Sequence, residues 1–368
     1  MYIHLNKDWP NFNWDNNILL PYVSSVRDLQ GRLIGRMESL GFELREEAVL
    51  ETLTDDIVQS SAIEGEFLNP GEVRSSIARR LGLDISGLPE ARRDVEGVVE
   101  MMLDATQQFE APLTKDRLRG WHAALFPTGR SGMHKITVGD WRSDARGPMQ
   151  VVSGPMGREK VHYTAPEANR LESEMNRFIH WFNTDDHMDP VIKSAIAHLW
   201  FVSIHPFDDG NGRIARAIAD CQLARADRTR QRFYSMSAQI MKSKKEYYHI
   251  LESTQKGSLN VSQWLVWYLE RLTEAVEATD ETLSKVLVEA KFWDLHRTTR
   301  LNERQVKMIN VLLGGFAGKL HSSKWAKMTK VHRDTALRDI QDLVEKGILS
   351  DSGEGGRSTN YILNLPRL

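Results

Sequence analysis

One stretch decides the fold of this chain: His205-Pro206-Phe207-Asp208-Asp209-Gly210-Asn211-Gly212-Arg213-Ile214-Ala215-Arg216. Apolar residues recur at helical spacing on both sides of it, with Ile192, Ala195, Ile196 and Leu199 before it and Ile214, Ala217, Ile218 and Cys221 after it. Pro206 ends the first helical run, and Gly210 and Gly212 permit a tight turn into the second. The pattern predicts two buried helices joined by a short loop.

The polar residues of this stretch are suited to holding phosphate. The first turn of the second helix leaves backbone N–H groups free and carries the positive end of the helix dipole. Arg213 and Arg216 are on one helix face and can bind further phosphate oxygens. Asp209 could hold a hard cation such as Mg²⁺ against those phosphates. His205, at the end of the first helix, could take a proton from an incoming hydroxyl.

Each feature alone is common, because a Gly-x-Gly is usually a turn and a His before Pro is usually a helix end. Together they resemble, at every fixed position, the Fic family signature His-x-Phe-x-Asp/Glu-Gly-Asn-Gly-Arg-x-x-Arg. The resemblance implies transfer of AMP from ATP to a Ser, Thr or Tyr hydroxyl of a protein. It implies that His205 is the catalytic base and that Asp209 binds Mg²⁺. It also implies nucleotide binding by Gly210, Asn211, Gly212, Arg213 and Arg216.

A second motif precedes the first by a long way. Ser60-x-x-x-Glu64-Gly65 resembles the inhibitory motif of the family, Ser/Thr-x-x-x-Glu-Gly/Asn. Without the core motif it would be an ordinary helix end with a solvated glutamate. The resemblance implies that Glu64 pairs with Arg216, so that the arginine cannot hold the γ-phosphate. The chain would then be a class II enzyme, regulated through Ser60 and Glu64.

Two short strand-like runs, Met149–Ser153 and Lys160–Thr164, flank a glycine-containing turn and predict a β-hairpin. It resembles the Fic flap, to which a target segment adds as an extra strand. The resemblance assigns target docking to Val161, His162 and Tyr163; a plain surface hairpin is the alternative. Tyr247 and Tyr248 resemble the adenosine-side contacts of the family, although an aromatic helix face packed on the core would look the same.

The expected fold class is mainly α, with a small hairpin. We assign residues 1–110 to an N-terminal helical region, 111–280 to the catalytic core, 281–300 to a linker helix and 301–368 to a separate domain. This last part shows three helical runs, then strands near Leu349 and Tyr361 around a Gly353–Gly356 turn, and it resembles a winged helix-turn-helix. Its 11 Lys+Arg and 7 Asp+Glu give a net charge of +4, so DNA binding and protein contacts both remain open.

The composition of the whole chain restricts the class of protein to which it could belong. With 41% hydrophobic and 27% charged residues the chain is typical of soluble globular proteins, and its net charge of −2 gives no bulk attraction for nucleic acid. Cys221 is the one cysteine, so no disulfide framework is expected. We expect no signal peptide, no membrane span and, by default, a cytoplasmic location.

The resemblance implies the partners of this chain. They are ATP and a protein target, which could be the chain itself, and a homodimer is left open. The alternatives are a DNA-binding transcriptional regulator whose Fic core senses nucleotide, and a Fic enzyme that uses another nucleotide or phosphoryl donor.

Overall fold

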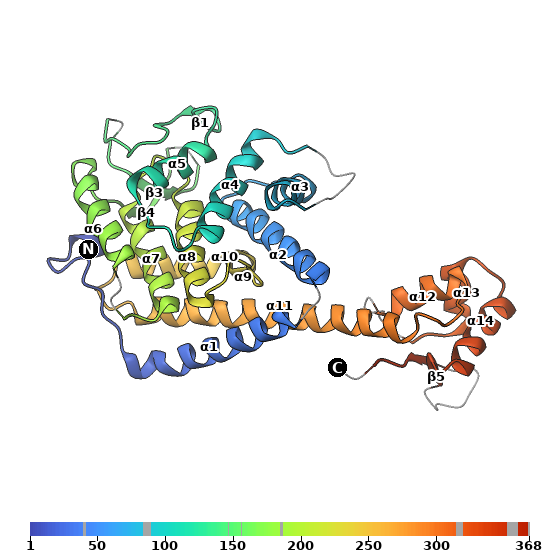
Figure 1. Ribbon diagram of the computed structural model, residues 1–368. Coiled ribbons are helices and arrows are strands. Elements are labelled where there is room, and N and C mark those ends of the chain that lie inside the picture. Colours follow the sequence, from blue (N-terminus) through green and yellow to red (C-terminus); the bar gives the residue numbers. More distant parts are fainter. Residues whose placement is uncertain are drawn as a thin grey trace. The chain divides into compact units, whose positions relative to one another are not determined.

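The computed structural model describes residues 1–39, 42–83, 90–145, 147–155, 157–184, 187–313, 319–351 and 360–366. The chain divides into two compact units, Met1–Thr279 and Asp280–Leu368 (Figure 1). The boundary falls inside one helix, α11 (Ser262–Leu295), which continues past residue 280, where the sequence analysis ended the core.

The N-terminal part of the first unit is a series of helices: α1 (Asn16–Glu38), α2 (Phe42–Ile63), α3 (Pro70–Leu81), α4 (Arg93–Gln107) and α5 (Lys115–Leu125). A single turn of 3₁₀ helix, η1 (Ile3–Leu5), precedes them. α1 begins at Asn16 because the Asp15 side chain caps it, accepting from the Asn17 N–H at 2.8 Å.

The rest of the first unit contains two hairpins and the central helices. These are β1 (Arg130–Ser131), β2 (His134–Lys135), β3 (Gln150–Ser153), β4 (Lys160–Thr164), η2 (Ala168–Arg170), α6 (Leu171–Asn183), α7 (Pro190–Ile204), α8 (Asn211–Asp227), α9 (Met236–Lys242) and α10 (Lys244–Gln255). β3 and β4 form the predicted antiparallel hairpin, with a register shift between Val151 and Val152. The β1–β2 hairpin was not predicted.

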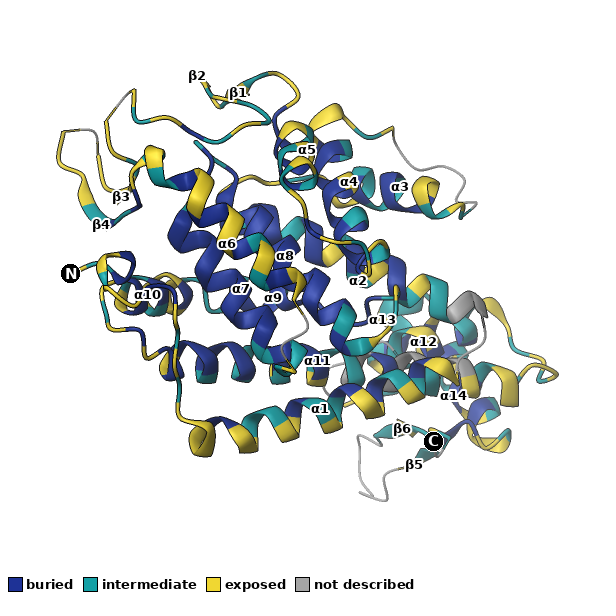
Figure 2. Cartoon of the chain, turned by 60° about the vertical axis from the view of Figure 1, so that its left-hand side comes forward, coloured by how far each residue is buried: buried dark blue, intermediate teal, exposed yellow. Residues whose placement is uncertain are grey.

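The core of this unit lies around α7 and α8, which pack against each other (Figure 2). α7 is mostly apolar, and every residue from Lys193 to Ile204 is buried, as expected for a helix without a solvent face. α8 is buried along most of its length, including Cys221. The prediction of two buried helices around a short loop, and of a mainly helical fold, is confirmed.

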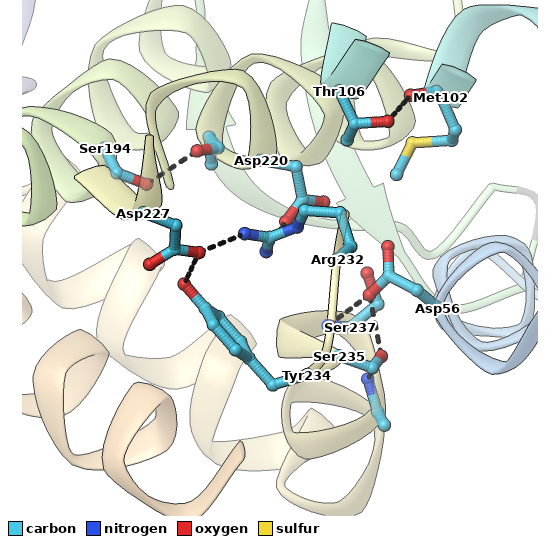
Figure 3. A network of polar contacts seen from close by, with 12 residues as sticks. Asp56, Met102, Thr106, Ser194, Asp220, Asp227, Arg232, Tyr234, Ser235 and Ser237 are labelled. Carbon is cyan, nitrogen blue, oxygen red and sulfur yellow. Dashed lines mark hydrogen bonds and ion pairs between the residues drawn. The ribbon is translucent and has the colours of Figure 1, made fainter. Parts of the chain in front are cut away.

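A buried polar network holds the C-terminal end of α8. The guanidinium of Arg232 donates to Asp220 at 2.9 Å and to Asp227 at 3.0 Å, and Tyr234 donates to Asp227 at 2.7 Å (Figure 3). Burial, and then the charge of nearby Asp56, raises the pKa of Asp220 well above its ordinary value. The arginine therefore compensates two carboxylates that are expensive to bury.

The same region anchors α2. Asp56 of α2 accepts from the Ser235 hydroxyl at 2.7 Å and from the Ser237 N–H at 3.1 Å (Figure 3). Asp56 is one turn before Ser60, so the helix that carries the predicted inhibitory motif is tied to the start of α9 by buried hydrogen bonds. This contact sets where the end of α2 lies.

The second unit has its own hydrophobic core, which includes Phe292, Met308, Trp325 and Ile340. Its elements after α11 are α12 (Glu303–Leu313), α13 (Ser322–Thr329), α14 (Arg333–Glu345) and the antiparallel pair β5 (Leu349–Asp351) and β6 (Tyr361–Leu363). The order of three helices and two strands is the one expected; the Gly353–Gly356 turn lies outside the described residues. Throughout the described ranges, no helix combines the length and apolar character that a membrane span requires.

Candidate active site

The site is built on the loop between α7 and α8. His205 ends α7 in a left-handed conformation, with φ 53° and ψ 59°, and its N–H donates to the Phe201 carbonyl at 3.0 Å. Pro206 follows, and the residue before a proline is disfavoured in the right-handed helical region. A left-handed non-glycine residue costs about 1–2 kcal/mol. Such strain is concentrated at functional positions.

The ring of His205 is held in one tautomer by a backbone contact. Its Nδ1 lies 3.2 Å from the Val202 carbonyl oxygen, and a carbonyl can only accept, so Nδ1 carries the proton and Nε2 keeps its lone pair. Burial is the main reason that the pKa of His205 is lowered to about 4. The imidazole is therefore neutral near pH 7 and able to accept a proton at Nε2.

Gly210 and Asn211 shape the turn into α8. Gly210 caps the helix with φ 79°, and a Cβ added there would lie 2.9 Å from Cε2 of Phe126. The Asn211 side chain accepts from the Phe207 N–H at 3.0 Å and donates to the Phe207 carbonyl at 2.8 Å. Both ends of the Asn211 amide are thus used inside the loop, which leaves its backbone for the phosphate role expected from the sequence.

Gly212 lies directly under the Glu64 carboxylate. A Cβ at Gly212 would be 2.1 Å from Oε1 of Glu64, so only glycine allows this approach. The carboxylate therefore occupies the first turn of α8, where the free N–H groups and the positive dipole end favour an anion. This is the place that the sequence analysis assigned to phosphate.

Arg216 joins the two predicted motifs. Its Nη2 donates to Oε1 of Glu64 and to the Ser60 carbonyl, both at 2.8 Å, and its Nε donates to the Ser60 hydroxyl at 2.8 Å. The Arg216 side chain is 2% exposed, whereas that of Glu64 is 31% exposed. Nη1 of Arg216 is buried and has no hydrogen-bond partner within the part of the chain that the structure describes. Three of the guanidinium's interactions are thus made with the end of α2.

Arg213 has a partner that the sequence analysis did not name. Its Nη1 donates to the Glu66 carboxylate, and its guanidinium lies over the Phe126 ring, 5.2 Å from the centroid. Gly65, with φ 84°, turns the chain between the two glutamates, and the Glu66 N–H donates to the Ser61 carbonyl at 3.0 Å. Burial raises the pKa of Glu66, while Arg213 opposes this. Both arginines of the core motif are therefore paired with carboxylates from the end of α2.

Asp209 lies directly before Gly210, at the start of α8. Its carboxylate accepts from the Gly210 N–H at 2.6 Å and from the Ser131 hydroxyl of the β1–β2 hairpin. No group of three or more His, Cys, Asp or Glu suited to a metal occurs among the described residues. Mg²⁺ usually takes one or two carboxylates together with substrate phosphates and water, so a single carboxylate beside a phosphate site fits this ion. Neighbouring Asp208 has a structural partner, the Thr137 N–H at 2.8 Å.

The neighbouring residues Tyr247 and Tyr248 differ in how far their side chains are buried. Tyr247 is 2% exposed and its hydroxyl contacts Nε2 of His198 at 2.8 Å, which is the core packing left open as its alternative role. Tyr248 is 39% exposed, and its hydroxyl donates to the Ile63 carbonyl at 3.1 Å and to Glu64 at 3.5 Å. The Tyr248 side chain contacts Glu64, and the buried Tyr247 hydroxyl lies close enough to Arg216 for the arginine charge to act on it.

The flap residues also differ among themselves. Tyr163 is 1% exposed and donates to the Ser203 carbonyl at 2.7 Å, so its side chain anchors β4 to α7 and only its backbone remains for docking. His162 is half-buried, and its ring nitrogens lie 2.6 Å from Ser153 and 2.6 Å from Glu252 of α10. Val161 is half-buried.

Comparison with known families supports the motif and the helical core together. Residues 112–223 match the Fic/DOC family. The chain carries a Fic/DOC domain. The match includes the loop and most of α8, whereas Ser60 and Glu64 fall within residues 2–83, which match a domain of unknown function, DUF4172.

Curated relatives of the Fic domain cover part of their own length. Protein adenylyltransferase Fic of Drosophila grimshawi is 27% identical over 218 residues, which is 57% of this chain and 39% of the relative. The protein of the same description in Drosophila mojavensis is 32% identical over 213 residues, 57% of this chain and 38% of the relative. The matched region thus spans about two fifths of these relatives.

Solved structures share the fold. A Fic family protein from Desulfovibrio desulfuricans has a TM-score of 0.53 at 21% identity, covering 96% of this chain and 98% of its own. Fic-1 of Caenorhabditis elegans, residues 134–508, has a TM-score of 0.51 at 18% identity, covering 73% of this chain and 74% of its own. At these identities the likeness concerns the fold of the Fic domain.

Proposed function

We propose that this protein is a protein adenylyltransferase held inactive by Glu64. One observation carries the proposal: the Glu64 carboxylate bonds to Arg216 at the N-terminus of α8, at the end of the loop that carries a neutral, oriented His205. An anion site, a base and an internal competitor for the anion site thus occur together. Relatives described as protein adenylyltransferases support this reaction class.

The transfer would proceed by attack of a protein hydroxyl on the α-phosphorus of ATP. Nε2 of His205 takes the hydroxyl proton, the oxygen bonds to the α-phosphorus, and the bond from that phosphorus to the oxygen bridging the β-phosphate breaks. AMP is left on the side chain and pyrophosphate departs. The first turn of α8 and the guanidinium groups of Arg213 and Arg216 bind the triphosphate oxygens. Asp209 would hold Mg²⁺, which supplies positive charge to neutralise the phosphates.

Inhibition follows from competition for Arg216. A guanidinium that already donates to Glu64 and Ser60 cannot also bind a γ-phosphate with the same N–H groups. The Glu64 carboxylate also repels a triphosphate brought to the same helix end. We expect ATP to bind in a geometry that does not align the α-phosphorus with the hydroxyl, so wild-type transfer is slow.

The target hydroxyl would be delivered by the β3–β4 flap. Two-stranded sheets leave strand edges to which an extended segment can add through main-chain hydrogen bonds. Strand addition positions a side chain by register and not by its chemistry, so Ser, Thr or Tyr could serve as acceptor. The chain itself is one available target.

Labelled ATP with Mg²⁺ tests the function. We expect weak labelling by wild type and strong labelling, of itself or of a partner, by Glu64→Gly, because the competitor is removed. Glu64→Gly combined with Arg216→Ala should be inactive, because the phosphate contact is lost. Glu51→Gly is the matched control, since Glu51 is an exposed glutamate of the same helix. A Glu64→Gly protein that binds ATP but labels no faster than wild type refutes the inhibition, and parallel assays with other labelled nucleotides test the donor.

DNA binding by residues 301–368 is a second candidate. The net charge of +4 and the order of three helices and two strands favour it. A gel-shift assay with DNA at several salt concentrations tests it, because binding through phosphates weakens steeply as salt rises.

A further inference from the structure

Arg142 is a buried arginine between the base and the flap. It lies in the segment that joins β2 to β3, and its side chain is 0% exposed. A buried guanidinium needs a polar partner for its donors, so its contacts show what it holds in place. Its contacts lie in two places, on the loop between α7 and α8 and in the segment that follows β4 of the flap.

On the catalytic loop, Arg142 bonds to two successive carbonyls. Its Nε donates to the His205 carbonyl at 2.8 Å, and its backbone N–H donates to the Pro206 carbonyl at 2.9 Å. Carbonyls at a helix C-terminus lack intrahelical partners. Arg142 satisfies them and thereby holds the strained left-handed backbone of His205.

At the flap, the other end of the same guanidinium reaches the segment after β4. Nη2 donates to the Pro166 carbonyl at 2.5 Å, and Nη1 donates to Asp144 at 2.9 Å. Asp144 in turn accepts from the Ala168 N–H at 2.6 Å, on the far side of Pro166. One rigid planar guanidinium therefore links the backbone of His205 to the segment that follows β4 of the flap.

We propose that Arg142 is a positioning residue for AMP transfer, which fixes the distance between His205 and the hydroxyl that the flap presents. The proposal rests on the proposed function. It does not involve nucleotide binding, because the phosphate contacts lie on α8. Lysine cannot replace Arg142, since one ammonium cannot reproduce the fork of donors that spans both sides.

Kinetics in the Glu64→Gly background test the proposal. Arg142→Met and Arg142→Lys should lower kcat for transfer by about 10²-fold, because small displacements of reacting groups have effects of this size, while the KM for ATP is unchanged. For Arg142→Met, which removes a positive charge, the acid limb of the kcat/KM profile should also move to higher pH, because the charge of Arg142 lowers the pKa of His205. Asp144→Asn should lower kcat less, because it leaves the contacts of Arg142 with the His205, Pro206 and Pro166 carbonyls in place.

Arg225→Met is the matched control. Arg225 also donates to backbone carbonyls of the same unit, to Phe109 at 2.7 Å and to Ala111 at 3.3 Å, but away from the loop and the flap. Its variant should lose stability and keep kcat. If Arg225→Met and Arg142→Met lower kcat equally, or if Arg142→Met raises the KM for ATP without changing kcat, the positioning role is wrong.

Amide hydrogen exchange separates this inference from the proposed function. In otherwise wild-type protein, Arg142→Met should speed exchange at Phe207 and at the β4 amides together, relative to Arg225→Met. Unchanged exchange at either segment overturns the link. If Glu64→Gly transfers no AMP, the proposed function fails, and the exchange result still decides whether Arg142 holds loop and flap.

Discussion

Glu66 is paired with Arg213 in the same way that Glu64 is paired with Arg216. The two glutamates flank Gly65 at the C-terminus of α2, where the negative end of the helix dipole disfavours carboxylates. Their pairing with two arginines from the first turns of α8 offsets that cost. The end of α2 therefore presents two carboxylates to the two guanidinium groups that would bind phosphates.

The first prediction concerns Glu66. In the Glu64→Gly background, Glu66→Gln should lower the KM for ATP about two- to fivefold, the range expected for a half-exposed ion pair. In the presence of Glu64 the same change should have little effect, because Arg216 remains blocked. Initial rates of labelling at varied ATP concentration measure both cases.

Glu51→Gln controls for the loss of a negative charge from α2, since Glu51 is exposed on the same helix. An equal change in KM from Glu51→Gln would mean that only the overall charge matters. No change from Glu66→Gln would mean that Arg213 exchanges its partner freely and that Glu64 alone inhibits.

The second prediction concerns His205. In the Glu64→Gly background, His205→Ala should reduce transfer by about 10²-fold or more while ATP still binds, because the phosphate contacts lie on α8. Since the pKa of His205 is lowered to about 4, the neutral base predominates above that pH. The kcat/KM of the Glu64→Gly protein should therefore stay level from pH 8 to pH 5 and fall only below this.

A fall centred near pH 6.5, the ordinary pKa of histidine, would show that His205 is solvated before ATP binds. Undiminished transfer by His205→Ala would remove it from the mechanism.

The sequence predicted the parts of the site that are local or spaced by a motif. The loop, its flanking helices and the β3–β4 hairpin follow from apolar periodicity and turn residues. The contact between Glu64 and Arg216 was expected only from the resemblance, because 152 positions separate the two residues. Nothing in local propensity could have placed them together.

What could not be predicted is the use that folding makes of ordinary polar residues. Glu66 lies outside the motif. The one hint in the sequence is that Glu64 and Glu66 are close together, as Arg213 and Arg216 are, so that a second ion pair could form beside the first. Arg142 precedes a glycine- and proline-rich stretch and has no periodic signal, yet it bonds across to His205. Such partners depend on which backbone carbonyls are left unpaired in three dimensions.

The third prediction concerns the network around Arg232. Arg232→Met should lower the free energy of unfolding by about 3–5 kcal/mol, because Asp220 and Asp227 would be left buried without a cation. Without the arginine, the pKa values of both carboxyls in the folded state would rise further above their values in the unfolded state. Their ionisation then costs stability as the pH rises, so the loss should be larger at pH 8 than at pH 5. Urea denaturation at both pH values measures it.

Arg32→Met provides the control, since Arg32 and its partner Asp28 are each 65% exposed. It should cost less than about 1 kcal/mol. A similarly small loss for Arg232→Met at both pH values would mean that Asp220 and Asp227 are neutral in the native protein.

The last prediction concerns the boundary inside α11. Truncation after Thr279 in the Glu64→Gly background should leave AMP transfer measurable, because every candidate site residue lies in the first compact unit. Truncation after Arg300, at the boundary expected from the sequence, should retain transfer but give a protein more prone to aggregate. It keeps Phe292, whose buried partners Met308, Trp325 and Ile340 would be gone, so an apolar side chain is exposed. Light scattering and labelling of the two truncated proteins distinguish the boundaries. If truncation after Thr279 gives a folded but inert protein, the second unit takes part in the reaction, and the division of labour drawn from the site is wrong.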